Sequence, residues 1–105
     1  MGQIKKLSDS EVLEQIKGLE GWTLQSGKLH KAYKFKDFVE AFGFMAQVAL
    51  LAETMDHHPE WSNVYSRVTI DLVTHDAGGI SSKDFELAKK IDALALSKGK
   101  GIPAT

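Results

Sequence analysis

The stretch from Phe38 to Met55 limits the folds open to this chain more than any other feature, because it predicts a helix that is apolar almost all round. Asp37 can cap it, no proline interrupts it, and its thin polar edge carries Glu40 and Gln47. It bears two apolar stripes, Phe38, Phe42, Met45, Ala49 and Ala52, and then Phe44, Val48, Leu51 and Met55. Such a helix must be buried on more than one side. In a chain of 105 residues we expect one side to face a sheet and the other a second subunit, which predicts a homo-oligomer.

Shorter elements precede this helix. Ser8 and Glu11 have the spacing of a capping box, which predicts a short helix ending near Gly18. Two runs follow, at 22–24 and 29–35, and the Ser-Gly pair between them is typical of a hairpin turn.

The elements after the long helix have equally clear boundaries. Pro59 disfavours helix at the residue before it, so the helix should end near Asp56. A strand pair or one long strand is expected between 64 and 72, followed by a turn at 76–79. Ser81 and Asp84 predict a second capping box. The apolar face of the last helix consists of Leu87, Ala88, Ile91, Leu94 and Ala95. The order of elements predicts an α+β fold with an antiparallel sheet.

Length and charge narrow the functional classes. A chain of 105 residues predicts a single domain over 1–105, with an ordered core at about 7–97. The net charge of −1 lacks the basic footprint of a nucleic-acid binder, and the absence of cysteine excludes disulfides and thiolate chemistry. We see no signal-peptide core and no apolar run near the ~20 residues of a membrane helix. We therefore expect a soluble intracellular protein located in the cytoplasm, with the nucleus as an additional compartment.

Three of the four histidines lie where regular structure is expected to end. His57 and His58 follow the long helix, and His75 precedes the last turn, whereas His30 is expected to be an ordinary surface residue. Glu53 stands one helical turn before His57 and could orient its ring. The pair His57-His58 could also be a plain polar loop. A metal site is the remaining alternative, although the spacing of zinc ligands is not present.

Without a nucleophile elbow, a metal motif or a phosphate loop, the chemistry that these residues favour is proton transfer. Histidine titrates near neutral pH and can act as acid or base. General acid–base assistance is worth roughly 10²- to 10⁴-fold, which suits an intermediate already inclined to lose water. The residues alone predict a histidine acid–base site and leave its substrate open.

A specific motif resembles the signature of the pterin-4a-carbinolamine dehydratases. It runs from Glu53 to Tyr65 as Glu-Thr-Met-Asp-His-His-Pro-Glu-Trp-Ser-Asn-Val-Tyr, and is followed by Thr74-His75 and Asp84. The segment Phe38–Met45 and the pair Gly21-Trp22 are similar too. The resemblance spans about Leu7 to Ala95.

The resemblance implies a four-stranded antiparallel sheet with three helices on one face, and homodimers or homotetramers. It implies a cofactor-free hydro-lyase that dehydrates 4a-hydroxytetrahydrobiopterin to quinonoid dihydrobiopterin, in the recycling of tetrahydrobiopterin. Animal members also stabilise the dimer of a homeodomain transcription factor, so a coactivator or interaction module is the alternative function.

The resemblance also assigns roles to individual residues. His57 and His75 would be the acid–base pair, His58 would bind and orient the pterin, and Glu53 would support the histidines. The remaining substrate-binding positions are Trp22, Thr74 and Asp56. Asp84 matches the last motif position, although capping explains it equally well. The family often has arginine where this chain has Lys83, and lysine would keep the charge without the planar fork.

Overall fold

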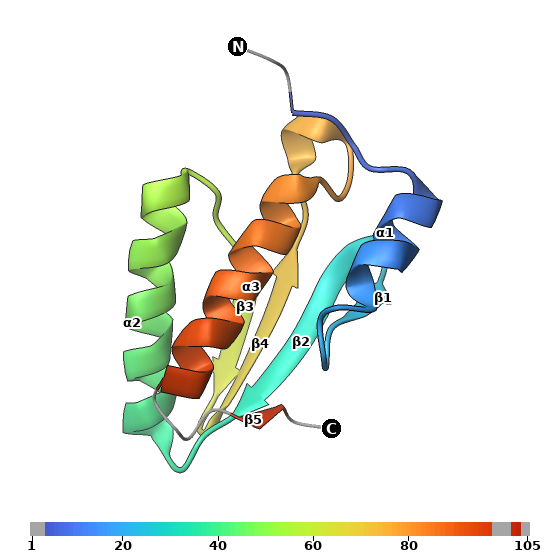
Figure 1. Cartoon of the computed structure of the whole chain (residues 1–105). Coiled ribbons are helices and arrows are strands. Elements are labelled where there is room, and N and C mark those ends of the chain that lie inside the picture. The colour runs from blue at the N-terminus through green and yellow to red at the C-terminus, as the bar shows by residue number, and fades with distance from the viewer. Residues whose placement is uncertain (1–3, 98–101, 104–105) are drawn as a thin grey trace.

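The computed structural model describes residues 4–97 and 102–103 (Figure 1). In chain order the elements are α1 (Asp9–Ile16), β1 (Thr23–Gln25), β2 (Lys28–Lys34), α2 (Phe38–Met55), β3 (Glu60–Val64), β4 (Arg67–Leu72), the 3-10 turn η1 (His75–Ala77), α3 (Ser82–Ser97) and β5 (Ile102–Pro103). The predicted order of three helices and two strand pairs is confirmed, and the fold is α+β.

The strands form one antiparallel sheet in the order β1-β2-β4-β3. A short fifth strand, β5, pairs with β2 through Tyr33 and Lys34. This strand lies outside the range 7–97 in which we expected the ordered core. Because β5 is two residues long and contains a proline, no periodic pattern in the sequence predicts it.

The hydrophobic core lies between the helices and one face of the sheet. Alternate residues of β2 and β4 point into it, as the period of two in a strand requires. All three helices contribute to the same buried cluster. The largest fully buried apolar side chains are Tyr33, Phe44, Phe85, Leu29, Ile70, Leu72, Leu87 and Ile91.

The long helix begins and ends as its sequence predicts. The Asp37 carboxylate accepts a hydrogen bond from the backbone N–H of Glu40 at 2.9 Å and caps the helix. At the other end Asp56 adopts a left-handed conformation, with φ of 51°. This residue stops the helix and turns the chain toward β3.

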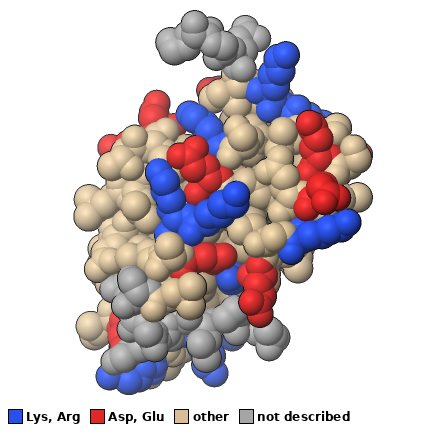
Figure 2. Space-filling view, viewed as in Figure 1, with Lys and Arg blue, Asp and Glu red and all other residues tan. Residues whose placement is uncertain are grey.

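The helix α2 buries one side and exposes the other, and this division cuts across the two predicted stripes. Ala41, Phe44, Val48 and Ala52 lie in the core, so Ala52, which we placed in the stripe with Phe38 and Phe42, is buried. Phe38 and Phe42 are solvent-exposed, and Phe42 retains 59% of its accessible surface. Figure 2 shows few charged side chains on the side of the molecule formed by α2. The large exposed apolar residues of this face, called the outer α2 face below, are Phe38, Val39, Phe42 and Leu50.

The expectation that no segment approaches a membrane span is wrong for α2 on length and composition alone. The helix has 18 residues and a mean hydropathy of 1.3, enough to pass that test. Its buried side, however, packs on β3, β4 and α3. Packing against the chain's own sheet and α3 accounts for the apolar character of this buried side.

Candidate active site

A hollow of about 250 Å³ lies where α2 ends, β4 ends and α3 begins. The polar residues lining it that carry the argument below are Asp56, His57, His58, Thr74, His75 and Lys83. The motif's three histidines therefore share one cavity. A larger hollow of about 450 Å³ lies beside α1 and the β1–β2 turn, and the described residues that line it include no histidine.

The end of α2 separates the two adjacent histidines. The backbone N–H groups of Asp56 and His57 donate to the carbonyls of Glu53 and Ala52, both at 3.1 Å, so the left-handed turn is firmly closed. His57 then enters the protein and is 8% exposed, whereas His58 faces outward. The two rings consequently occupy different environments although they are neighbours in sequence.

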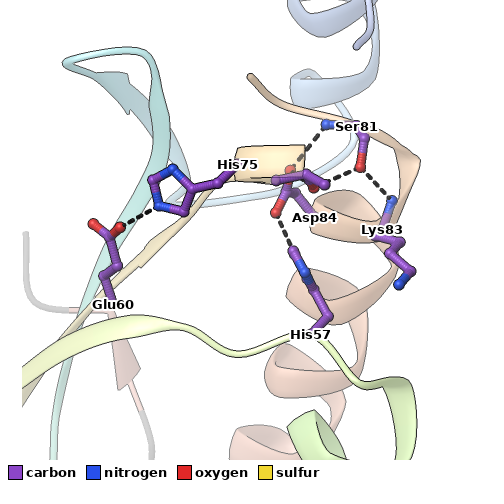
Figure 3. A network of polar contacts seen from close by, with 7 residues as sticks. His57, Glu60, His75, Ser81, Lys83 and Asp84 are labelled. Atoms are coloured by element: carbon purple, nitrogen blue, oxygen red, sulfur yellow. Dashed lines mark hydrogen bonds and ion pairs between the residues drawn. The ribbon is translucent and has the colours of Figure 1, made fainter. Parts of the chain in front are cut away.

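His57 is held by a buried carboxylate at the start of α3. Its Nε2 lies 2.6 Å from Oδ1 of Asp84, whose side chain is fully buried (Figure 3). Oδ2 of Asp84 accepts two further hydrogen bonds, from Thr74 Oγ1 at 2.8 Å and from the Ser81 N–H at 2.9 Å. Since the Thr74 hydroxyl proton is directed at the carboxylate, Thr74 must accept from the Ser81 hydroxyl at 2.6 Å.

This network explains why Asp84 is more than a helix cap. One half of the predicted capping box is present, because Asp84 accepts from the Ser81 N–H, whereas the Ser81 hydroxyl accepts from the Lys83 N–H in place of that of Asp84. The same carboxylate also fixes His57, which lies 27 residues earlier in the chain. A fully buried charge is retained where it is paired and hydrogen-bonded, and Asp84 meets both conditions.

The other two histidines pair with exposed carboxylates. Nε2 of His58 lies 2.6 Å from Oε1 of Glu53, and Nε2 of His75 lies 2.9 Å from Oε2 of Glu60. We expected Glu53 to orient His57, and this prediction is wrong. The left-handed residue at the end of α2 breaks the i, i+4 relation that would have brought Glu53 to His57.

Each of the three imidazoles therefore donates from Nε2 to a carboxylate. A carboxylate can only accept, so Nε2 must carry the proton in the neutral ring. Nδ1 is then the nitrogen left for exchanging a proton with a bound molecule.

Thr74 and His75 owe their positions to a tight turn after β4. Thr74 forms an isolated β-bridge with Gly79, and the 3-10 turn of His75–Ala77 lies between them. Gly78 closes this turn with φ of 81°, a conformation that suits glycine. The turn presents the His75 ring to solvent at the cavity rim, with 75% of its side chain exposed.

Trp22 does not line the histidine cavity, contrary to our expectation. Its indole is 4% exposed, and Nε1 donates to Oδ2 of Asp92 at 3.0 Å. The other oxygen of Asp92 accepts from Lys31 at 2.9 Å and from the Tyr33 hydroxyl. Trp22 thus belongs to a buried polar cluster joining β2 to α3, and the spacing of aromatic residues alone could not distinguish this from a pocket wall.

Sequence reasoning also missed residues that shape the site. Ile4 lines the cavity from the N-terminal segment, with nothing in its sequence context to mark it. Asn63, a motif residue without an assigned role, donates to the carbonyls of Tyr65 and Arg67 at 3.1 and 2.8 Å. It braces the β3–β4 turn, in which Tyr65 has a φ of 52°. Glu60 was part of the motif, and its pairing with His75 was not anticipated.

Within residues 4–97 and 102–103, no group of three or more histidine or acidic side chains is arranged to hold a metal ion. The three histidines turn their Nε2 edges toward three different carboxylates. This arrangement favours proton transfer by separate rings.

Comparisons with known proteins agree with the motif. The model of the family described as pterin 4 alpha carbinolamine dehydratase matches residues 5–94. A protein of Solibacter usitatus named "putative pterin-4-alpha-carbinolamine dehydratase" is 62% identical over 86% of this chain and 95% of its own length. A relative with the same name from Prochlorococcus marinus is 52% identical over 86% of this chain and 94% of its own.

Solved structures support the same grouping. The crystal structure of a transcriptional coactivator/pterin dehydratase from Brucella melitensis is 46% identical, with a TM-score of 0.82. The match covers 86% of this chain and 98% of that one. The family model covers residues 5–94, which include the three histidines, and each of these relatives covers 86% of the chain. The chain belongs to the pterin-4a-carbinolamine dehydratase family.

Proposed function

We propose that this protein catalyses the dehydration of a 4a-hydroxytetrahydropterin, with its histidines as general acid and base. The observation that carries the proposal is the single cavity lined by His57, His58 and His75, each bound through Nε2 to its own carboxylate. Membership of the dehydratase family supports the choice of a pterin carbinolamine as substrate.

The reaction is an elimination without a change of oxidation state. The C4a–O bond breaks as a protonated imidazole delivers a proton to the leaving hydroxyl, which departs as water. A neutral imidazole accepts the proton from N5, and the N–H electron pair becomes the C4a=N5 double bond. One proton is added and one removed, so no cofactor is consumed.

His57 and His75 are the proposed acid–base pair, and His58 binds and orients the ring. Because Nε2 of His57 is committed to Asp84, this residue would exchange its proton through Nδ1. Lys83 lines the same cavity and supplies a cation that could contact a carbonyl or side-chain oxygen of the pterin. Thr74 is bonded to Asp84 and Ser81, which favours a supporting role over direct substrate contact.

The quinonoid dihydropterin released by this step is a substrate for reduction back to the tetrahydropterin. We therefore place the protein in the recycling of tetrahydrobiopterin or a related pterin. The enzyme that oxidises the tetrahydropterin in its own reaction cycle would supply the carbinolamine.

Self-association is part of this proposal. The outer α2 face exposes Phe38, Val39, Phe42 and Leu50 on one side of the helix, and an exposed apolar face of this kind marks an interaction site. A homodimer or homotetramer that buries this face would also suit a small domain with little stabilising reserve.

A coactivator role is the second candidate, because the Brucella melitensis relative is described as a transcriptional coactivator/pterin dehydratase. The outer α2 face could serve either a second copy or another protein. Substitutions can distinguish the two roles. Replacing the histidines should abolish dehydration and leave assembly unchanged, whereas replacing residues of the outer α2 face should disturb assembly first.

A stopped-flow assay on chemically generated 4a-carbinolamine tests the proposal. We expect the decay of its absorbance to accelerate in proportion to protein concentration. Binding of a pterin without any increase in rate would identify a binding protein and refute the dehydratase assignment.

A further inference from the structure

Glu60, the first residue of β3, makes a contact that the proposed reaction does not yet use. One oxygen of its carboxylate lies 2.9 Å from Nε2 of His75 (Figure 3). The other oxygen is paired with Nζ of Lys28 at the start of β2. Glu60 itself does not line the cavity, whereas His75 does. Its influence on a bound molecule would therefore pass through His75.

The sheet fixes the position of Glu60. Its Cα is paired in the sheet with that of Asp71 in β4, and Asp71 in turn is paired with His30 in β2. These residues share the face of the sheet that is opposite to the core, where His30 Nδ1 lies 2.8 Å from Asp71. The carboxylate of Glu60 thus starts from a backbone held by two neighbouring strands, while His75 sits on a turn that is mostly exposed.

The charges around this contact favour an ionised Glu60. The hydrogen bond from Lys28 and that from His75 lower the pKa of Glu60, and Glu60 raises the pKa of Lys28. The other titratable groups that share the cavity with His75 are Asp56, His57, His58, Asp76 and Lys83. Among the described residues, Glu60 is the carboxylate within hydrogen-bond distance of the His75 ring.

We infer that Glu60 is a positioning residue for the dehydration, holding the His75 imidazole with its Nδ1 edge available to the substrate while Lys28 holds Glu60 in place. The inference rests on the proposed function. The inference also sets His75 apart from His57. His57 is fixed by a buried hydrogen-bond network, whereas His75 depends on one exposed contact with Glu60, which is in turn paired with Lys28.

A double-substitution cycle tests the route through His75. Glu60→Gln should lower kcat about two- to fivefold with KM unchanged, the range typical of an exposed charged pair. In a His75→Gln background the same substitution should have no further effect, because its route of action is gone. Glu60→Asp, which keeps the charge, should recover part of the loss. Glu86→Gln, which breaks an exposed pair with Lys90 on α3, is the matched control and should leave both constants unchanged.

A second measurement needs no substrate, so it separates this inference from the proposed function. Titrating the Glu60 carboxyl by ¹³C NMR should give a pKa below the usual range. That pKa should rise in Lys28→Met and, to a smaller extent, in His75→Gln. An unchanged Glu60 titration in His75→Gln, or an equal loss of kcat from Glu60→Gln with and without His75, would overturn the positioning role. Absence of dehydratase activity in the unsubstituted protein would instead refute the proposed function.

Discussion

Replacing Asp84 by asparagine tests the buried network most sharply. The carboxylate presents two acceptors, one to His57 and one shared by Thr74 and the Ser81 N–H. Asparagine has the same shape but only one oxygen, and that oxygen should stay where two donors meet. The amide NH₂ would then face Nε2 of His57. This imidazole would be forced to accept at Nε2 and carry its proton on Nδ1, the edge proposed to serve the substrate.

The expected losses of stability and activity follow from the hydrogen bond that the substitution changes. The hydrogen bond between His57 and a carboxylate becomes one between neutral partners, a difference of about 1–1.5 kcal/mol. A domain of this size loses roughly 4–8 °C in Tm per kcal/mol, so Asp84→Asn should lower Tm by about 4–12 °C. Because His57 would hold its proton on the wrong nitrogen, kcat should fall by about 10²- to 10⁴-fold, the full value of acid–base assistance. Stopped-flow kinetics and thermal unfolding measure the two losses separately.

Ser81→Ala is the matched control, since it removes a hydroxyl from the same network without touching the contact between His57 and Asp84. It should lower Tm while leaving kcat within a few-fold of the unsubstituted protein. The reasoning is refuted if Asp84→Asn keeps full activity, or if the two variants lose activity in proportion to their loss of Tm.

Three other predictions give independent checks. Burial, and after it the hydrogen bond to Asp92, raises the pKa of Tyr33. The phenol therefore ionises more readily in the unfolded chain, so the free energy of unfolding should fall as pH rises above about 10. Tyr33→Phe should flatten this dependence on pH in urea unfolding measured at pH 7–11. Phe42→Asp should lower the mass measured by light scattering while the circular dichroism spectrum is retained, whereas Phe44→Asp, in the core, should unfold the chain. Ser8→Ala removes the capping box of α1 and should cost about 0.5–2 kcal/mol of unfolding free energy, and no loss would contradict the role of the cap.

Local signals predicted most of the fold. Ser8, Asp37 and the pair Ser81 and Asp84 marked the helix starts because capping is encoded within four residues. In the region 60–72 it was harder to decide between a strand pair and one long strand, because the turn contains neither glycine nor proline. Asn63 makes that turn by binding two carbonyls, a contact that only the folded hairpin displays.

The site could be predicted only in part, because its partners lie far apart in sequence. The histidines were recognisable from their motif, and the structure places all three around one cavity. The pairing of His57 with Asp84 depends on where α3 packs against the end of α2, which no spacing reveals. Trp22 was misplaced for the same reason, since its partner Asp92 comes from a helix 70 residues later.

The two stripes of α2 were recognised, but sequence periodicity could not decide which of them faces the sheet. Phe44 and Val48 belong to the core, so the expected subunit contact falls on the stripe that contains Phe38 and Phe42. Ala52 was assigned to the stripe of Phe38 and Phe42 but is buried in the core, because the angle at which the helix docks is not encoded in its periodicity.

The central claim is that histidine side chains in one cavity carry out the dehydration, and the variant His57→Ala with His75→Ala tests it most directly. In a single-turnover stopped-flow assay on 4a-carbinolamine, the unsubstituted protein should accelerate the loss of water, and the double variant should return to the spontaneous rate. Light scattering should show the same assembly for both proteins. A double variant that dehydrates the substrate as fast as the unsubstituted protein would contradict the account.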